Sequence, residues 1–171
     1  MFSLTEGSFL LFLQDYIRHP WLDAFFTFIT KLGNAGLIWI LEGIILLICK
    51  KHRREGIAVL LALLIGFIIT NLLLKNIVAR PRPYTLLNEL EILIKAPSDY
   101  SFPSGHTCSS VAAALTMLKL SDKRIGIAAC ILAVLIAFSR MYIGVHYPSD
   151  VLAGAVIGAF AAFLSVGMVK K

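Results

Sequence analysis

Residues 56–74 have the sequence GIAVLLALLIGFIITNLLL, an apolar run without a single charged side chain. A helix needs about 20 residues to cross the hydrocarbon core of a bilayer, so this run alone predicts a membrane span. Residues 151–169 form a second charge-free run of the same length. The whole chain of 171 residues is 58% hydrophobic and only 15% charged, with a mean hydropathy of +0.84. This composition is typical of a polytopic membrane protein and excludes an ordinary soluble domain.

Four shorter apolar segments are also predicted to cross the membrane. They are Pro20–Leu32, Ala35–Cys49, Thr107–Leu120 and Ile125–Ser139. The segment Ser3–Ile17 is interpreted as an amphipathic helix that lies in the membrane interface. We therefore expect one all-α domain over residues 1–171, a bundle of six transmembrane helices preceded by an interfacial helix.

Basic residues predict the orientation of this bundle. Nine lysines and arginines form three clusters, at residues 50–54, 119–124 and 170–171. An even number of predicted spans separates these clusters, so they share one side, and the positive-inside rule makes that side cytoplasmic. Both termini are then expected in the cytoplasm, with the segment Lys75–Gly105 outside. Because the basic residues flank apolar runs and are not gathered on one surface, the charge of +6 does not indicate nucleic-acid binding.

Cysteine and carboxylate patterns exclude two kinds of phosphatase site. Cys49, Cys108 and Cys130 lie in or beside apolar segments, and none is followed six residues later by an arginine, as a thiolate phosphatase requires. Since no cluster of carboxylates or CxxC pair is present, we expect no metal and no cofactor.

The outer segment contains four of the six prolines, so it cannot be helical throughout. A long ordered loop in a small protein is usually functional. Within it, Leu86, Leu90 and Ile94 recur at helical spacing. This spacing indicates either a short helix packed on the bundle or a lid where a lipid tail enters.

Cations and histidines gather at the predicted outer face. An arginine that ends an apolar span, as Arg140 does, is costly in a membrane and usually faces a polar cavity. Together these residues indicate an anionic substrate, most naturally a phosphate. They are Lys75, Arg80, Arg82, Lys95, His106, Arg140 and His146.

Two of the stretches at this face suit phosphate binding. Residues 75–83 (KNIVARPRP) place one lysine at the end of a span and two arginines in the loop. Residues 103–106 (PSGH) directly precede a predicted helix. Gly105 lets the backbone approach an anion there, and the helix N-terminus directs free N–H groups at it.

The third stretch, residues 139–150 (SRMYIGVHYPSD), combines a cation with a possible nucleophile. Asp150 follows His146 by four residues, so its carboxylate can accept a hydrogen bond from the imidazole. That bond would fix the tautomer and make the other ring nitrogen a better nucleophile.

The three stretches together resemble the type 2 phosphatidic acid phosphatase superfamily, which includes vanadium haloperoxidases and glucose-6-phosphatase. The family pattern is Lys-x6-Arg-Pro, Pro-Ser-Gly-His and Ser-Arg-x5-His-x3-Asp, and this sequence matches it in order without a substitution. The resemblance implies that His146 attacks phosphorus and becomes a phosphohistidine, and that Asp150 orients it. His106 would protonate the leaving oxygen and then activate water. The implied ligands of the phosphate oxygens are Lys75, Arg82, Ser104, Gly105 and Arg140.

The same resemblance predicts a lipid phosphatase of the bacterial inner membrane with its active site facing outward. The expected partners are the lipid phosphate and the bilayer, and the protein would be a monomer or a weak dimer. We favour undecaprenyl pyrophosphate as the expected substrate, with phosphatidylglycerophosphate and the lipid A 1-phosphate as alternatives. A vanadate-dependent haloperoxidase or a non-enzymatic lipid-binding protein would be alternatives of another class. Arg80 is expected to support the site or to touch a headgroup, in preference to binding the phosphate itself. Gly154 and Gly158 are expected to pack within the bundle in preference to a dimer interface.

Overall fold

The computed structural model describes residues 2–170, with side chains from Thr5 on, and this part of the chain is helical without any strand. Lys171, a member of the third basic cluster, lies outside the described residues. The α-helices are α1 (Phe2–Phe12), α2 (Pro20–Leu32), α3 (Leu37–Ile48), α4 (Arg53–Phe67), α5 (Lys75–Val78), α6 (Pro83–Leu86), α7 (Gly105–Leu120), α8 (Lys123–Tyr142) and α9 (Pro148–Val169). Short π and 3-10 segments are η1 (Leu13–Ile17), η2 (Asn34–Gly36), η3 (Lys50–His52) and η4 (Ile68–Leu74).

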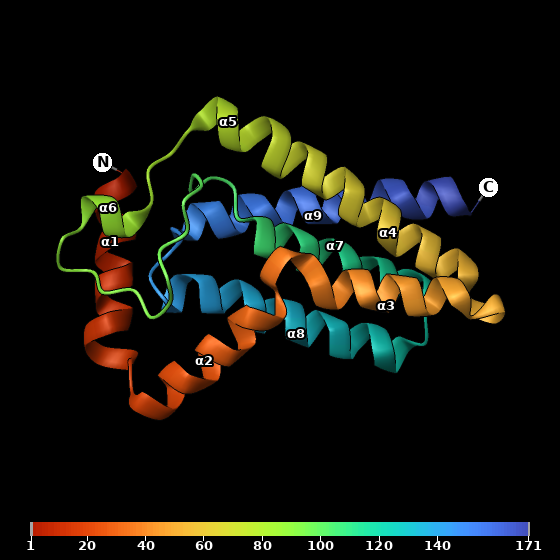
Figure 1. Ribbon diagram of the computed structural model, residues 1–171, viewed down its shortest axis with the longest axis horizontal. Coiled ribbons are helices and arrows are strands. Elements are labelled where there is room, and N and C mark those ends of the chain that lie inside the picture. Colours follow the sequence, from red (N-terminus) through yellow and green to blue (C-terminus); the bar gives the residue numbers. More distant parts are fainter. Residues whose placement is uncertain (1, 171) are drawn as a thin grey trace.

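Helix α7 lies at the centre of the bundle, between α4, α8 and α9 (Figure 1). Glycines on α9 allow a close contact with α7. A Cβ atom added at Gly154 would come within 2.5 Å of the Ser104 carbonyl oxygen, and one at Gly158 within 2.5 Å of the Cys108 carbonyl oxygen. The two glycines therefore pack inside the chain, against α7, as the sequence predicted.

Only some of the helices are long enough to span a membrane by themselves. Among the described residues, three segments are long and apolar enough: Lys50–Leu86, Lys123–Tyr142 and Pro148–Val169. Pro20–Leu32 and Asn34–Ile48 qualify only as a pair, bent by 42° at the break between them. Helix α7 has 16 residues, about 24 Å at 1.5 Å per residue. The structure supports an integral membrane protein, but six separate spans are not confirmed.

The break between α2 and α3 has a backbone cause. Ala35 and Gly36 both have positive φ, 53° and 66°, which no continuous right-handed helix accommodates. With 13 and 12 residues, each helix reaches only about 20 Å. Together they run from the end that holds α1 to the opposite end, as a bent pair that is long enough for one span (Figure 1). The first helix and the C-terminus consequently lie at opposite ends of the bundle, which differs from the predicted topology with both termini on one side.

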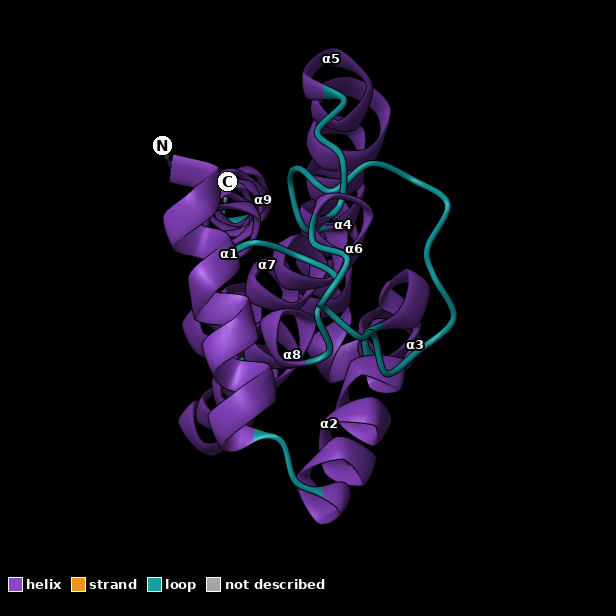
Figure 2. Ribbon diagram, turned by 90° about the vertical axis from the view of Figure 1, so that its left-hand side faces the viewer, coloured by secondary structure: helices purple, strands orange, loops and turns teal. Residues whose placement is uncertain are grey.

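Helix α1 lies across one end of the bundle, in front of the ends of α8 and α9 (Figure 2). Leu10 and Leu13 are buried against Leu90 and Tyr147. On the opposite side of the helix, Phe12 is exposed. The α1 helix therefore covers the end of the bundle to which the outer loop is attached.

The outer loop does not form the helix that the spacing of Leu86, Leu90 and Ile94 suggested. Helix α6 ends at Leu86, after one turn, and the chain continues without regular structure. Side chains that follow helix α1 donate hydrogen bonds to loop carbonyl groups, which in a helix would accept from backbone N–H groups. Gln14 donates to the Glu89 carbonyl at 3.1 Å, and Arg18 donates to the Glu91 carbonyl at 2.8 Å. Tertiary hydrogen bonds thus replace helical ones in this loop.

Candidate active site

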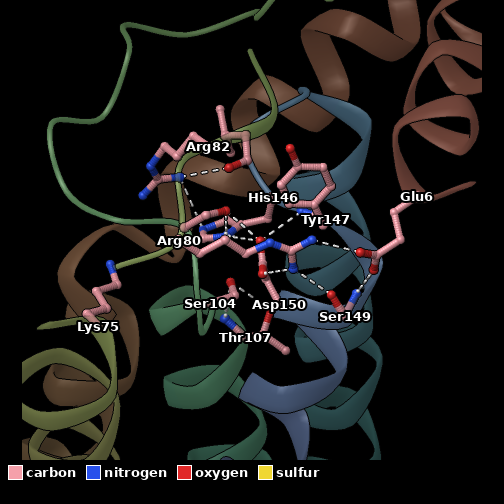
Figure 3. Close-up of polar contacts among 12 residues, drawn as sticks. Glu6, Lys75, Arg80, Arg82, Ser104, Thr107, His146, Tyr147, Ser149 and Asp150 are labelled. Carbon is pink, nitrogen blue, oxygen red and sulfur yellow. Dashed lines mark hydrogen bonds and ion pairs between the residues drawn. The ribbon is translucent and has the colours of Figure 1, made fainter. Parts of the chain in front are cut away.

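The residues of the three motifs meet at one end of the bundle, although they come from helices α5, α7, α8 and α9 and from the loops between helices. Figure 3 shows Lys75, Arg82, Ser104, His146 and Asp150 among them. They surround a cavity of about 900 Å³. The motif residues that line it are Lys75, Arg82, Gly105, His106, Arg140 and His146. Ser104 and Asp150 are fully buried behind the wall of the cavity.

His146 and Asp150 form a buried pair between α8 and the first turn of α9. The Nδ1 atom of His146 lies 3.4 Å from Oδ2 of Asp150, and the two residues are 1% and 0% exposed. Asp150 also accepts a hydrogen bond from the Ser101 hydroxyl at 2.5 Å and from the Tyr147 N–H at 2.9 Å. The second of these bonds caps α9, so the start of the helix fixes the carboxylate in place.

The environment keeps the imidazole of His146 neutral. Burial lowers its pKa to about 3, and the charges of Arg140 and Arg82 add to this effect, while the hydrogen bond to Asp150 opposes it. Because the carboxylate accepts the Nδ1 proton, Nε2 carries the free lone pair. This Nε2 atom lies 3.4 Å from Nη1 of Arg82. A neutral imidazole nitrogen beside a cation that can hold an anion has the properties of a nucleophile.

Arg80 lies behind the cavity, where it connects Asp150 to the first helix. Its guanidinium donates to Oδ1 of Asp150 and to the Ser149 hydroxyl, each at 2.7 Å, and to Glu6 at 2.8 Å. The same group stacks 3.9 Å from the centre of the Tyr147 ring. Glu6 in turn accepts the Ser149 N–H at 2.7 Å. Arg80 therefore supports the catalytic pair, one of the two roles that the sequence left open. The contribution of Glu6 was not predicted. The only indication in the sequence is that an acidic residue occurs there within an apolar segment.

Lys75 and Arg82 share one carboxylate, which the sequence analysis missed. Asp99 Oδ1 accepts from Arg82 at 2.7 Å, and its other oxygen contacts the Lys75 ammonium. Burial alone would raise the pKa of Asp99, but the hydrogen bond from Lys75 and the charges of Lys75 and Arg82 lower it to about 2. Arg82 also donates to the Val145 carbonyl at 2.8 Å. The two cations are thus buried, rigidly held and neutralised in part by an ionised side chain at the cavity wall.

Arg140 is the least satisfied of the buried cations. It is 2% exposed at the end of α8, and its Nη1 donates to the Thr30 hydroxyl at 2.6 Å. Its Nε atom is buried and has no hydrogen-bond partner among the described residues. Since Arg140 also lines the cavity, it retains donor capacity toward an anion there.

Ser104 and Gly105 begin helix α7. The Ser104 oxygen accepts from the Thr107 hydroxyl at 3.1 Å and from the Thr107 N–H at 3.5 Å, which makes Ser104 the N-cap of the helix. Its hydroxyl hydrogen remains to be donated, although the side chain lies behind the cavity wall. Gly105 lines the cavity directly, beside Asn71.

His106 faces the same cavity from the first turn of α7, and the break between α2 and α3 holds it. Its Nε2 atom lies 3.0 Å from Oδ1 of Asn34. A Cβ atom added at Gly33 would come within 2.8 Å of the imidazole. Neither neighbour was predicted, because hydropathy gives no sign that a loop between apolar segments will touch the site.

Beyond His106 the cavity becomes apolar. Its wall continues between α3 and α4, where Ile40, Leu64 and Phe67 line it and are also exposed on the outside of the bundle. A cationic end and an apolar wall in one cavity suit an anion that carries a hydrocarbon chain. The described residues contain no group of three or more His, Cys, Asp or Glu side chains placed to hold a metal ion.

Comparison with known proteins agrees with this geometry. The PAP2 superfamily model matches residues 55–171. The chain is 36% identical to the undecaprenyl-diphosphatase of Sulfolobus acidocaldarius, over 93% of this chain and 79% of the relative. It is 33% identical to phosphatidylglycerophosphatase B of Bacillus subtilis, over 91% of this chain and 79% of that protein. The solved structure of Aquifex aeolicus LpxE aligns with a TM-score of 0.82 and 30% identity, over 94% of this chain and 93% of that one. The chain therefore belongs to the PAP2 superfamily.

Proposed function

We propose that the protein is a membrane-embedded lipid phosphatase that removes the terminal phosphate of a lipid phosphate or diphosphate through a phosphohistidine. The observation that carries this proposal is that one cavity is lined both by His146 with three buried cations and by apolar side chains of α3 and α4. The family membership and the lipid phosphatases among the relatives support it. Undecaprenyl diphosphate is the preferred substrate.

The first step transfers the phosphoryl group to the protein. Lys75, Arg82 and Arg140, with the N–H of Gly105, bind the three non-bridging oxygens, where transition-state charge is spread. The Ser104 hydroxyl would join them only if the cavity wall in front of it moved, because that side chain is buried. Nε2 of His146 attacks phosphorus in line, and the bond from phosphorus to the leaving oxygen breaks. Protonated His106 gives its proton to that oxygen, while Asp150 stabilises the positive charge on the phosphorylated imidazole.

The second step restores the protein. His106, now neutral, takes a proton from water as the water oxygen attacks phosphorus. The bond between phosphorus and nitrogen breaks, phosphate leaves, and His146 returns to its neutral form. With Nε2 of His106 donating to Asn34 in both protonation states, Nδ1 would act as the acid and then as the base without the ring turning.

We also propose that the active site faces the outside of the cytoplasmic membrane. The basic residues at 50–54, 119–124 and 170 lie at the end of the bundle opposite the site (Figure 1), which the positive-inside rule makes cytoplasmic. The broken α2–α3 pass then puts the first helix at the outer interface, where exposed Phe12 and Tyr16 would contact headgroups. The C-terminus alone would be cytoplasmic.

Cysteine labelling tests this orientation, after the three native cysteines have been replaced by alanine. An impermeant maleimide should react in intact cells with Tyr16→Cys and Asn88→Cys, and with Lys51→Cys only after permeabilisation. Protection of Asn88→Cys in intact cells would show that the site faces inward. Protection of Tyr16→Cys alone would restore the topology with both termini in the cytoplasm.

A phosphate-release panel tests the activity itself. Purified protein in detergent should release phosphate from undecaprenyl diphosphate, phosphatidylglycerophosphate or lipid A 1-phosphate, and His146→Ala should release none. Halide oxidation with added vanadate, without phosphate release, would identify a haloperoxidase instead. If well-folded protein binds these lipids but hydrolyses none of them, only a lipid-binding role remains.

A further inference from the structure

Lys31 lies beside the part of the active site that receives the leaving group. Its neighbour Thr30 accepts the hydrogen bond of Arg140, and Gly33 and Asn34 contact His106. Lys31 itself is an exposed residue in the last turn of α2 and lines the same cavity. Residues on both sides of Lys31 in the sequence are therefore already part of the site.

Lys95 lines the cavity from the outer loop and is likewise exposed. Within the described part of the chain, no ion pair involves Lys31 or Lys95. Asp99 is the sole acid among the described residues that line this cavity, and it is occupied by two other cations. The proposed phosphate transfer uses neither lysine. The cavity thus holds more positive charge than the cleavage of one phosphate group requires.

The contacts of His106 indicate where this extra charge acts. His106 protonates the leaving oxygen in the proposed mechanism, so the leaving group lies on the His106 side. Lys31 precedes Gly33 and Asn34, which contact His106, and it lines the same cavity. Ile40 of the next helix adds an apolar side chain to the lining. The cavity thus combines a phosphate site, an acid, two further cations and an apolar surface. A lipid diphosphate presents matching groups: a terminal phosphate, a bridging oxygen, a second phosphate and a hydrocarbon tail.

We infer that Lys31 and Lys95 form a second anion subsite, which binds the lipid-side phosphate of a lipid diphosphate. The inference rests on the proposed function and names the substrate class. When the bridging bond breaks, negative charge grows on the lipid-side phosphate. A cation at that position stabilises the transition state more than the bound substrate, and the rate of cleavage rises. A lipid monophosphate has a carbon atom at this place and gains nothing from the subsite.

Two substrates with one tail test the subsite. Farnesyl diphosphate and farnesyl monophosphate are compared in detergent with Lys31→Gln, Lys95→Gln and the double variant. The matched control is Lys119→Gln, which removes an exposed lysine from the end of α7 remote from the site. We expect kcat/KM for the diphosphate to fall roughly tenfold per lysine, about the worth of one charge-assisted hydrogen bond. For the monophosphate, kcat/KM should stay within about twofold of the wild-type value. Lys31→Arg should keep the preference for the diphosphate over the monophosphate.

Equal losses on both substrates, or no loss on the diphosphate, would overturn the subsite while leaving the phosphatase function standing. Binding provides a readout that needs no turnover. A non-hydrolysable farnesyl methylenediphosphonate should raise the thermal midpoint of the wild type more than that of Lys31→Gln. Farnesyl phosphonate should stabilise both proteins equally. Equal stabilisation by the diphosphonate would refute the subsite even if the protein proved not to be a phosphatase.

Discussion

Replacing Asp150 by asparagine removes one charge from a carboxylate whose two oxygens have different partners. Oδ1 accepts from Arg80 alone, whereas Oδ2 accepts from Ser101 and the Tyr147 N–H and lies beside His146. An amide has one oxygen and one NH2 group. At the Oδ2 position the NH2 group would face several hydrogen-bond donors. It therefore occupies the Oδ1 position, where it faces only the Arg80 guanidinium. The ring of His146 stays oriented, and the contact with Arg80 is lost.

The size of the effect follows from these contacts. A hydrogen bond between charged groups contributes about 1.5–3 kcal/mol, and opposing two donors adds a further penalty, so we expect a loss of about 2–4 kcal/mol. For a chain of this length, about 1 kcal/mol lowers the thermal midpoint by roughly 2–4 °C. Turnover suffers more, because the phosphorylated imidazole loses its counter-charge. A loss of about 10⁴-fold is expected by analogy with the serine-protease triad.

The assay measures thermal midpoints and single-turnover phosphate release for Asp150→Asn, Arg80→Gln and the double variant. In the double variant no guanidinium opposes the new asparagine amide. The double variant should therefore lose about 1 kcal/mol less free energy of unfolding than the two single variants lose in total. Turnover should not recover, because the negative charge is still missing. Recovery of turnover, or a single Asp150→Asn variant within tenfold of the wild type, would refute this account of Asp150.

Acid-quench trapping of labelled phosphate should find no covalent species on His146→Ala, and label on that variant would reveal another nucleophile. With a good leaving group, His106→Ala should instead accumulate label, because hydrolysis still needs its base. Lowering the pH from 6.5 toward 4 should lower the free energy of unfolding, and the thermal midpoint with it, and His146 contributes at most about 1.4 kcal/mol per pH unit. Unfolded His146 binds a proton there, whereas folded His146, whose pKa is lowered to about 3, does not. A shallower profile in His146→Gln would confirm this contribution, and the same slope in that variant would contradict it. Activity should survive EDTA and be inhibited by vanadate, and loss of activity that Mg²⁺ restores would defeat the proposed mechanism.

Motif spacing predicted which side chains meet, but not all that holds them. Lys75, Arg82, His106, Arg140 and His146 line one cavity, as expected from their positions at the ends of apolar runs. Their chemical roles remain predictions. The spacing was informative because these residues flank rigid helices, whose ends are brought together by the packing of the bundle.

The partners of these residues were not predictable. Asp99 comes from an irregular loop, Glu6 from another helix, and Asn34 from a break between helices. Each acts through a tertiary contact that leaves no periodicity in the sequence. No hydrophobic pattern distinguishes such a residue from an ordinary polar one at the surface.

The predicted topology is not confirmed, for a related reason. Hydropathy treats Pro20–Leu32 and Ala35–Cys49 as two independent runs, and two crossings return the chain to its starting side. The positive φ values of Ala35 and Gly36 instead connect them as one bent pass. A local backbone feature of a few residues thus reverses the expected position of the whole first helix, and no property of the apolar side chains reports it.

The carboxylate of Asp99 supplies the empty cavity with its own counter-ion. A phosphate group and this side chain compete for the same lysine and arginine, Lys75 and Arg82. In the proposed mechanism, substrate would bind by exchange, with the lipid tail adding affinity that free phosphate lacks. After cleavage the tail would be gone, and the carboxylate could regain both cations and displace the inorganic product. The contact that neutralises two buried cations would then also limit product inhibition.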